Sequence, residues 1–500
     1  MIFNDFSDSD CAGSNLTATA SDSFESSLAS SLSEMNLDFK PSQAQMTPDL
    51  IHLERYTWNY RGEGGANLVI SLEVTFPFKK RSFSNQFKCN IFQDEKGTKQ
   101  IARFSKSKYK DKDNNAKIDE TAYYANSVMT PLLGPRFVRP VTIGIMDEFD
   151  FETVKMEAQP LRPLNRVKKD IKSRKVILSP DCVFLDSQHL FNTFGPTLSI
   201  EVKPKCGFFN PGTSTLCPRC LKQEAKLNEG NIDSISKYCP LDLFSGDLAR
   251  MKRAIFDLFE SPHNRFKVFR DGQLIYTEKI GHQEEVDALL NEYFKGTKND
   301  PGSGTNRLAS ILIAAMLDQQ SVNQGLFEMM PKTKKSPDTC DPLSKPLPPN
   351  CILDTLLRLQ KFCLEVNDVT AESISHKLIN DLSMDNLHQL TIWYPLLTEN
   401  AEITENILQQ NFGFQRISEL KKLQKFLCSV TAKDVSVLFT FRAVLDASLD
   451  VENVPCVTME GQVYRVMISV IDLDPKPVHR IPTWIEKRQD WLKKSYLNKN

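Results

Sequence analysis

Alternating apolar and polar side chains predict strands at several places along the chain. Such runs cover residues 67–74 and 99–104 in the first quarter, and residues 198–203, 435–441 and 464–473 later. Because successive side chains of a strand point to opposite faces, each run offers an apolar face that can be buried. The pattern therefore predicts a substantial content of β structure.

Three shorter apolar runs add to this picture. Residues 266–269 and 273–276 flank an Asp-Gly dipeptide at 271–272, which favours a tight hairpin turn. Residues 183–185 predict a short strand. It leads into residues 186–188, which we interpret as a connection between two lobes.

Helical spacing of apolar residues recurs in five segments, which are residues 119–129, 248–259, 308–317, 353–366 and 420–427. Pro131 is expected to limit the first of them, because proline lacks an amide proton and clashes with the preceding turn. No internal repeat is visible. Strands and helices together predict an α+β fold in two lobes.

Four segments carry no such period. Residues 1–48 are rich in Ser, Asp and Thr and have too few apolar groups to order themselves, which predicts a disordered tail. The tail is either a simple solvated leader or a carrier of phosphorylation or docking sites. Residues 77–98 predict a loop or extended hairpin, residues 106–117 a charged linker and residues 331–349 a mobile loop rich in Pro, Lys and Ser.

Composition narrows the class of protein. A chain of 500 residues with 40% hydrophobic residues can hold two or three packed units. Its net charge of −1 argues against a nucleic-acid-binding protein, which usually has a large basic excess. Any binding of a highly phosphorylated partner must therefore come from a local cluster of cations.

The N-terminal residues and the longest apolar run indicate where the protein works. The chain does not open with a basic region followed by an apolar run, so we expect no secretory signal. Residues 308–317 form the longest apolar stretch, about half of the roughly twenty residues that span a bilayer. We expect an intracellular protein, cytoplasmic or nuclear, with reduced thiols and no membrane segment.

A glycine-rich turn at residues 61–68 precedes the first predicted strand. Three glycines within four residues let the backbone approach phosphate oxygens, because no Cβ blocks the contact. Such a turn can also be a tight hairpin without a ligand. Arg103, in the next strand, is placed to contact phosphates, although an arginine there can equally be an edge-strand charge.

Two lysines and two aspartates supply the remaining parts of a phosphoryl-transfer site. Lys203 and Lys205 flank a proline that bends or ends the strand. In one interpretation, the rigid strand end points both ammonium groups at a ligand; in the other, the two lysines are simply a solvated strand end. Asp434 lies in a short polar turn between a helix and a strand. Asp472 stands where the apolar pattern of its strand predicts a buried residue, so it needs a partner. A metal ion is the natural partner, and a strand cap or structural salt bridge is the alternative.

Three cysteines suggest a second metal site. Cys217 and Cys220 have the spacing of a zinc knuckle, and Cys239 is within reach in sequence. A fourth ligand is not evident. Structural zinc and free thiols in a loop both remain open.

The chain resembles the inositol-pentakisphosphate 2-kinases, enzymes that make inositol hexakisphosphate from ATP and the 1,3,4,5,6-pentakisphosphate. The resemblance rests on six motifs in family order, from about residue 55 to the end. They are RGEGGANLV (61–69), PLLGP (131–135), EVKPKCGF (201–208), YCPLDLFSG (238–246), TAKDVS (431–436) and IDLDPKP (471–477).

This resemblance implies a distantly protein-kinase-like, bilobal fold. It places an N-lobe for the nucleotide at residues 49–187, a hinge near residues 186–188 and an enlarged inositide-binding C-lobe at residues 188–500. The residues that it assigns to ATP are Glu63, Gly64, Gly65, Ala66, Asn67, Leu68, Arg103, Asp186 and Glu201. The residues that it assigns to substrate phosphates are Arg166, Lys203, Lys205, Lys226, Asn264, Lys476 and Arg480.

The resemblance also implies the chemistry. Asp434 orients or deprotonates the 2-hydroxyl of the inositide, Lys203 offsets charge on the transferring group, and Asp472 holds Mg²⁺. We expect a monomer that uses ATP, Mg²⁺ and inositol pentakisphosphate, with zinc as a further structural ion. A kinase for another small hydroxylated substrate is one alternative. A scaffold that binds RNA or inositides through the basic segment 480–499, without catalysis, is the other.

Overall fold

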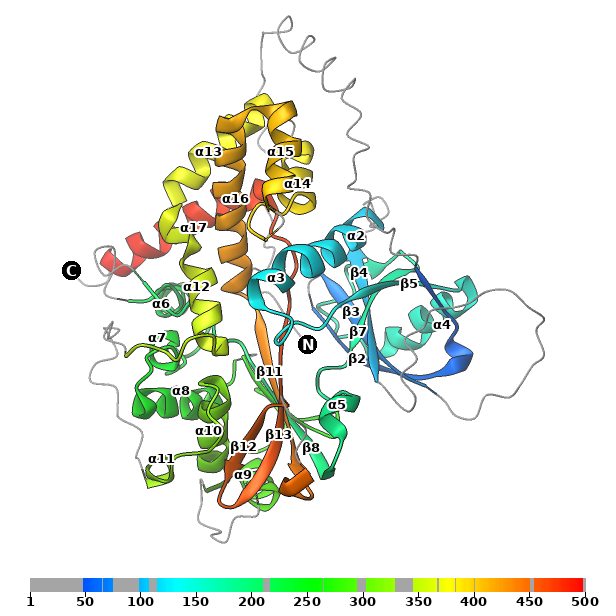
Figure 1. Cartoon of the computed structure of the whole chain (residues 1–500), viewed down its shortest axis with the longest axis vertical. Coiled ribbons are helices and arrows are strands. Elements are labelled where there is room, and N and C mark those ends of the chain that lie inside the picture. The colour runs from blue at the N-terminus through cyan, green and yellow to red at the C-terminus, as the bar shows by residue number, and fades with distance from the viewer. Residues whose placement is uncertain are drawn as a thin grey trace, which may run out of the picture.

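The computed structural model describes residues 48–64, 66–74, 99–107, 115–209, 216–263, 265–294, 303–328, 345–366, 368–382, 384–399, 401–449 and 454–497 (Figure 1). The predicted tail, except Pro48, and the predicted loop at 77–98 lie outside these ranges. So do most of the loop predicted at 331–349 and two predicted site residues, Gly65 and Asn264.

The N-terminal part of the chain forms a seven-stranded sheet. Its strands are β1 (Asp49–Ile51), β2 (Tyr56–Glu63), β3 (Asn67–Val74), β4 (Gln100–Ser107), β5 (Thr142–Met146), β6 (Asp170–Ile171) and β7 (Lys175–Pro180). They run in the order β1-β5-β7-β4-β3-β2, with β6 beside β4. Helix α4 (Glu148–Ala158) contributes Phe151 and Val154 to the apolar core of this sheet. The β2–β3 turn closes with the Gly64 amide donating to the Asn67 carbonyl at 2.8 Å.

A second, six-stranded sheet lies farther along the chain. Its strands are β8 (Thr193–Val202), β9 (Phe266–Arg270), β10 (Gln273–Tyr276), β11 (Ser436–Val444), β12 (Cys456–Met459) and β13 (Gln462–Ile471). They run in the order β10-β9-β8-β11-β13-β12, and all pairs are antiparallel. The register pairs Val437 with both Val202 and Val470. The end of β8, the start of β11 and the end of β13 therefore meet at one edge of the sheet.

Besides α4, the described residues form further helices. They are α2 (Asn115–Tyr123), α3 (Thr130–Leu133), α5 (Ser187–Leu190), α6 (Pro218–Asn228), α7 (Pro240–Leu243), α8 (Leu248–Glu260), α9 (Gln283–Tyr293), α10 (Ser303–Met316), α11 (Gln324–Glu328), α12 (Ile352–Glu365), α13 (Asp368–Asp381), α14 (Met384–Trp393), α15 (Ala401–Phe412), α16 (Phe414–Ala432) and α17 (Ile481–Leu497). Helix α2 contacts β5 and β7 of the first sheet. Apolar residues of α8, α10 and α12 share one core with β8, β9, β11 and β13. Helices α13 to α17 build a second apolar core, in the upper part of Figure 1.

Most predicted elements are confirmed. Residues 67–74 form β3, residues 248–259 lie in α8, and the Asp-Gly hairpin joins β9 to β10. Asp271 and Gly272 both have positive φ, 48° and 78°, as the predicted tight turn requires. The α+β class is thus correct. The helix predicted at 420–427 is longer than expected, because α16 extends over 19 residues.

Three local predictions were wrong. Residues 183–185 form no strand; they lie in the connection from β7 to β8. The linker expected at 106–117 is shortened from both sides by β4 and α2. Pro131 does not stop its helix, because a π-helical segment, Tyr124–Met129, precedes it, and the amide of Thr130 donates to the carbonyl of Ala125 in this wider turn.

Hydropathy adds one negative finding. Among the described residues, no helix combines the length and the apolar character needed to cross a bilayer.

Candidate active site

Strand ends of the second sheet bring the predicted lysines and aspartates together. Lys203 follows β8 directly, and its amide donates to the Arg265 carbonyl at 2.9 Å. Asp434 lies between α16 and β11, and Asp472 follows β13. Residues far apart in sequence therefore meet at one edge because the three central strands end there.

Lys203 and Asp472 form the inner pair of this site. The Lys203 ammonium lies 2.9 Å from Oδ2 of Asp472, and the exposed fractions of the two side chains are 5% and 15%. The Ser436 hydroxyl lies 3.1 Å from the same Oδ2 and 2.9 Å from Oε1 of Glu201. Glu201 is buried and also accepts from Lys267 at 2.8 Å. Glu201, which the resemblance assigns to ATP binding, is therefore part of the network that supports Lys203 and Asp472.

Asp434 is the centre of an outer triad. Its Oδ1 lies 3.0 Å from the Lys205 ammonium, and its Oδ2 lies 3.1 Å from the Lys476 ammonium. Each of the three side chains is less than one sixth exposed. One carboxylate thus holds two of the predicted phosphate-binding lysines in place, side by side at the edge of the sheet.

The protonation of these groups follows from their neighbours. Burial opposes ionisation of Asp434, but Lys205, Lys476 and Lys203 outweigh it and hold the pKa of its carboxyl well below the usual range. Burial likewise disfavours a charged Lys203, but Asp472, Asp434 and Glu201 raise the pKa of its ammonium above the usual value. Both groups are therefore charged at neutral pH.

Backbone conformation shapes two of these positions. Lys205 and Asp472 have φ values of 62° and 67°, in the left-handed region that side chains other than Gly and Asn rarely adopt. Gln360 of α12 secures the first of them: its side chain accepts from the Gly207 amide and donates to the carbonyls of Lys205 and Ala432 at 2.8–3.1 Å. Strain of this kind persists only where surrounding contacts hold it, and it is concentrated at functional sites.

The glycine-rich hairpin is anchored by a buried ion cluster. Glu63 is fully buried and accepts from Lys106 at 2.5 Å and from Arg162 at 3.0 Å. Its carboxylate is therefore committed to the protein. The Ala66 carbonyl accepts from the Lys106 amide at 2.7 Å, which ties the hairpin to β4, and Leu68 is buried in the core of the first sheet.

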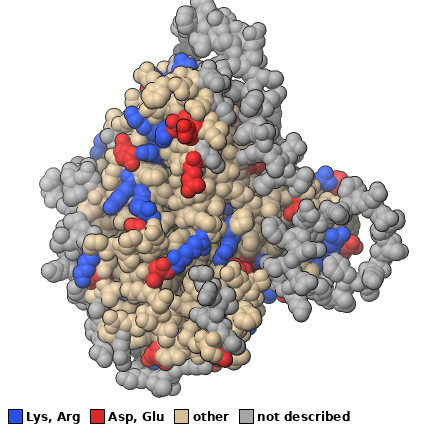
Figure 2. All heavy atoms as spheres, viewed as in Figure 1, with Lys and Arg blue, Asp and Glu red and all other residues tan. Residues whose placement is uncertain are grey.

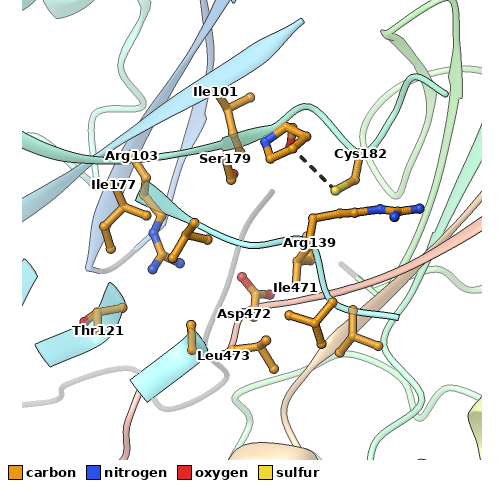
Figure 3. A pocket seen from close by; sticks show the side chains of 15 residues that line it. Ile101, Arg103, Thr121, Arg139, Ile177, Ser179, Cys182, Ile471, Asp472 and Leu473 are labelled. Carbon is orange, nitrogen blue, oxygen red and sulfur yellow. Dashed lines mark hydrogen bonds between the residues drawn. The ribbon is translucent and has the colours of Figure 1, made fainter. Parts of the chain in front are cut away.

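Arg103 reaches from β4 toward the end of β13. Its guanidinium lies 2.7 Å from Oδ1 of Asp474, and the side-chain amide nitrogen of Asn67 lies 3.4 Å from Oδ2 of Asp474. Arg103 and Asp472 also line a pocket of about 70 Å³ between the two sheets, whose other walls include Ile101, Ile177 and Leu473. Figure 3 shows Arg103 entering this pocket from one side and Asp472 from the other.

The connection between the two sheets borders the same pocket. Residues 181–192 join β7 to β8, and Cys182 lines the pocket. Asp186 begins α5, where it accepts from the His189 amide at 3.0 Å and lies 3.4 Å from the Arg139 guanidinium. Burial opposes ionisation of Asp186, but His189 and Arg139 keep the pKa of its carboxyl below the usual range.

The remaining predicted cations lie on separate elements. Arg166 lies in a turn, where its carbonyl accepts from the Arg162 guanidinium. Lys226 lies in α6, and Arg480 lies in a short 3-10 turn before α17. Figure 2 shows Lys and Arg side chains gathered across the middle of one face of the molecule. The geometry thus joins Lys203, Lys205 and Lys476 directly, and it leaves the roles of Arg166, Lys226 and Arg480 as predictions.

Several residues of the site were missed in the sequence. Ser436 and Asp474 lie inside the TAKDVS and IDLDPKP motifs, so position within a motif could have indicated them. Gln360, Lys267 and Arg162 carry no local signal, because their partners are remote in sequence.

The three cysteines predicted to bind zinc come together. Cys217 caps the start of α6, Cys239 precedes α7, and their sulfurs and that of Cys220 all lie within 4.8 Å of one another. All three thiols are buried. Arg219, between the two cysteines of the knuckle, donates to the Tyr238 carbonyl and lies with its guanidinium over the Tyr238 ring.

Lysines beside two aspartates, one of which lines a pocket between two sheets, define a site suited to phosphoryl transfer. Comparison with known proteins gives the family. The family model for inositol-pentakisphosphate 2-kinase matches residues 60–490, and the chain belongs to that family. This confirms the predicted family and the predicted enzyme class.

Individual relatives of the same name are similar in sequence to the chain, two of them over nearly their whole length and a third over about half. The inositol-pentakisphosphate 2-kinase of Danio rerio is 26% identical over 474 residues, covering 87% of this chain and 92% of that protein. The enzyme of the same name from Arabidopsis thaliana is 25% identical over 460 residues, covering 85% and 90%. A relative of that name from Drosophila melanogaster is 23% identical over 334 residues, covering 50% and 53%.

Proposed function

We propose that this chain transfers the γ-phosphoryl group of ATP to the 2-hydroxyl of inositol 1,3,4,5,6-pentakisphosphate, giving inositol hexakisphosphate. Family membership supports the reaction. The single observation that carries the assignment of the site is the contact of Asp434 with both Lys205 and Lys476, beside the Lys203–Asp472 pair.

Charge explains why lysines must crowd together here. A phosphate carries about −1.5 to −2 near neutral pH, so a pentakisphosphate needs many cations in one place. A chain of net charge −1 can supply them only by local clustering. Lys205 and Lys476 are assigned to substrate phosphates, with Arg166, Lys226, Arg480 and Asn264 as further predicted contacts.

Asp434 is assigned to the acceptor hydroxyl. A carboxyl whose pKa lies well below the usual range is a weak base, so its main contribution is to accept a hydrogen bond from the hydroxyl and hold it in line. As phosphates of the substrate engage Lys205 and Lys476, the Asp434 oxygens become available for that hydroxyl. Lys203 remains nearby to offset charge on the transferring group.

Asp472 fits the requirement for a magnesium ligand. Carboxylate oxygen is the donor that Mg²⁺ prefers, and among the described residues both polar contacts of Asp472 fall on Oδ2. Mg²⁺ held there would neutralise charge on the nucleotide phosphates. The role of Ser436 and Lys203 is to fix the direction of the Asp472 carboxylate.

ATP is assigned to the gap between the sheets, where the pocket of about 70 Å³ would hold only part of the nucleotide. The apolar walls of the pocket suit a base, and Arg103 and Asn67 face the end where phosphates would lie. Because Glu63 is buried and paired, the glycine-rich hairpin would act through the backbone of residues 64–68. We extend the proposal to a kinase-like bilobal architecture, in which the first sheet belongs to the N-lobe and residues 186–188, within the connection from β7 to β8, act as the hinge.

Zinc is proposed as a structural ion. Three buried thiols within 4.8 Å of one another match three of the four ligands of a structural zinc site. The ion would join the starts of α6 and α7, and α6 carries Lys226. An intracellular, monomeric enzyme remains our expectation.

A panel of inositol phosphates with radiolabelled ATP and Mg²⁺ tests the proposed function. We expect turnover to be fastest with the 1,3,4,5,6-pentakisphosphate. Faster turnover of another inositol phosphate would show that the assigned substrate is wrong. RNA binding without any ATP turnover would favour the scaffold alternative.

A further inference from the structure

Asp474 is an acidic residue of the IDLDPKP segment to which the proposed chemistry assigns no role. It lies two positions beyond Asp472, yet the two side chains point to different sheets. Asp472 contacts Lys203 and Ser436 of the second sheet, whereas Asp474 contacts Arg103 and Asn67 of the first. The positive φ of Asp472 turns the backbone between them.

The contacts of Asp474 connect three separate elements. Oδ1 accepts from the Arg103 guanidinium of β4 at 2.7 Å. Oδ2 lies 3.4 Å from the side-chain amide nitrogen of Asn67, at the start of β3. Its carbonyl lies 3.4 Å from the Thr431 hydroxyl in the last turn of α16, three residues before Asp434. Through its carboxylate and its carbonyl, Asp474 therefore joins the glycine-rich hairpin to the segment that holds the acceptor aspartate.

Asp474 forms a close ion pair with the guanidinium of Arg103. One third of its side chain is exposed, against 17% for Arg103. The pair is thus a charge-assisted hydrogen bond at the open side of the pocket, within reach of an incoming anion.

A carboxylate and a phosphate are alternative acceptors for the same donors. Guanidinium groups bind both anions with similar geometry, and a side-chain amide can donate to either. Arg103 and Asn67 are the two side-chain donors that we assign to nucleotide phosphates. A nucleotide phosphate that binds the same N–H groups must therefore displace Asp474.

We propose that Asp474 is a positioning residue that competes with nucleotide phosphates for Arg103 and Asn67, holding both donors at the pocket before ATP binds and recapturing them as ADP leaves. The inference rests on the proposed use of ATP. It predicts that the carboxylate weakens nucleotide binding and speeds product release. A metal ligand or a purely structural residue would have other effects.

The test compares the wild type with Asp474→Asn, which keeps the shape of the side chain and removes its charge. Dissociation constants for ATP are measured by titration calorimetry in EDTA and again with Mg²⁺, followed by kcat and KM. Without Mg²⁺, the variant should bind ATP about three- to tenfold more tightly, as expected for the loss of one competing ion pair. Its kcat should fall while KM for ATP falls with it.

Unchanged or weaker binding of metal-free ATP by the variant would overturn the inference. So would weaker binding confined to Mg²⁺-ATP, which would identify Asp474 as a metal ligand. If the wild type binds no ATP under either condition, the proposed function itself fails, and that outcome is distinct from a failure of Asp474 alone.

Three further variants make the test independent of folding. Asp318→Asn breaks the exposed Arg136–Asp318 pair, away from the pocket, and should leave ATP affinity unchanged. If Asp474→Asn unfolds, Asp474→Ser carries the same prediction, because it also lacks the charge. Asp474→Glu keeps the charge and should bind ATP no more tightly than the wild type.

Discussion

The ammonium group of Lys203 lies 2.9 Å from Oδ2 of Asp472, and these two residues come from strands that do not pair with each other. Strand β11 lies between them and contributes Ser436, whose hydroxyl touches the same carboxylate. The proposed metal ligand and its cation are thus positioned by the centre of a sheet. Elements of regular structure hold such groups more firmly than loops do.

Removal of Asp434 should separate catalysis from binding. We expect Asp434→Ala to lower kcat by about 100- to 10,000-fold, the usual range for a group that acts on the reacting proton. Inositide affinity should stay the same or increase, because Lys205 and Lys476 lose their internal partner. Titration calorimetry with the pentakisphosphate and steady-state kinetics measure the two effects. An active Asp434→Ala enzyme would remove Asp434 from the mechanism, and Asp446→Asn at an exposed acid serves as the control.

Lys205 offers a substitution that spares the backbone. Its φ of 62° costs a lysine about 1 kcal/mol, and glycine adopts that conformation freely. Lys205→Gly should therefore fold at least as well as Lys205→Ala. Both should chiefly raise KM for the inositide, as charge reversal at Arg480 should. Lys237→Gly at an exposed position provides the comparison. A variant that loses kcat but keeps KM would assign Lys205 to the reacting group instead.

Ser436 should influence the metal requirement. Its hydroxyl has one proton and lies near both Glu201 and Asp472, so it can donate to only one carboxylate at a time. Ser436→Ala should raise the Mg²⁺ concentration for half-maximal activity several-fold, because Asp472 loses an orienting contact. Ser199→Ala, at a buried serine of the same sheet, should not. Equal magnesium curves for both variants would show that Ser436 does not act through Asp472.

Acid should remove a stabilising contribution from Asp434. Because the folded state lowers the pKa of its carboxyl, that contribution is complete above the ordinary unfolded value of about 4. It is lost as the pH falls toward the lower folded pKa. Denaturant titrations of the wild type and of Asp434→Asn give the difference between their free energies of unfolding. This difference should be constant from pH 7 to 5 and should decrease below about pH 4. A difference that grows on acidification would have the wrong sign.

Zinc, if bound as proposed, should be measurable directly. Purified protein should contain about one zinc per chain, and Cys220→Ser should lose it and unfold at lower temperature. Cys428→Ser alters a buried thiol that contacts Tyr124, outside the cluster, and should retain the metal. If the purified wild type contains no metal and added zinc does not change its melting temperature, the zinc proposal is contradicted.

Local patterns predicted the central strands well. Residues 198–203 and 464–473 alternate although both faces of each strand are buried, because polar residues such as Ser199, Glu201 and Arg465 find partners on the second face. The Asp-Gly turn fixed its hairpin for a local reason as well, since both residues must adopt positive φ. Lys203, Lys205, Asp434 and Asp472 could be selected because each adjoins such an element.

Other features depend on contacts that no local pattern contains. Gln360 lies 155 residues from Lys205, so nothing near it indicates that it holds that backbone. The strand predicted at 183–185 failed because those apolar side chains fill a small core beside β11 and β13 without joining a ladder. The buried pairing of Glu63 with Arg162 was equally invisible, because the partners lie 99 residues apart.

The most direct test of the central claim is the position of the phosphate that the enzyme adds. Purified wild type and Asp434→Ala are incubated with ATP, Mg²⁺ and inositol 1,3,4,5,6-pentakisphosphate, and ³¹P NMR follows the product. We predict that the wild type phosphorylates the 2-hydroxyl to give the hexakisphosphate, while Asp434→Ala binds the substrate and forms that product at least about 100-fold more slowly. Failure of the wild type to phosphorylate that hydroxyl, or equal initial rates for the two proteins, would contradict the account.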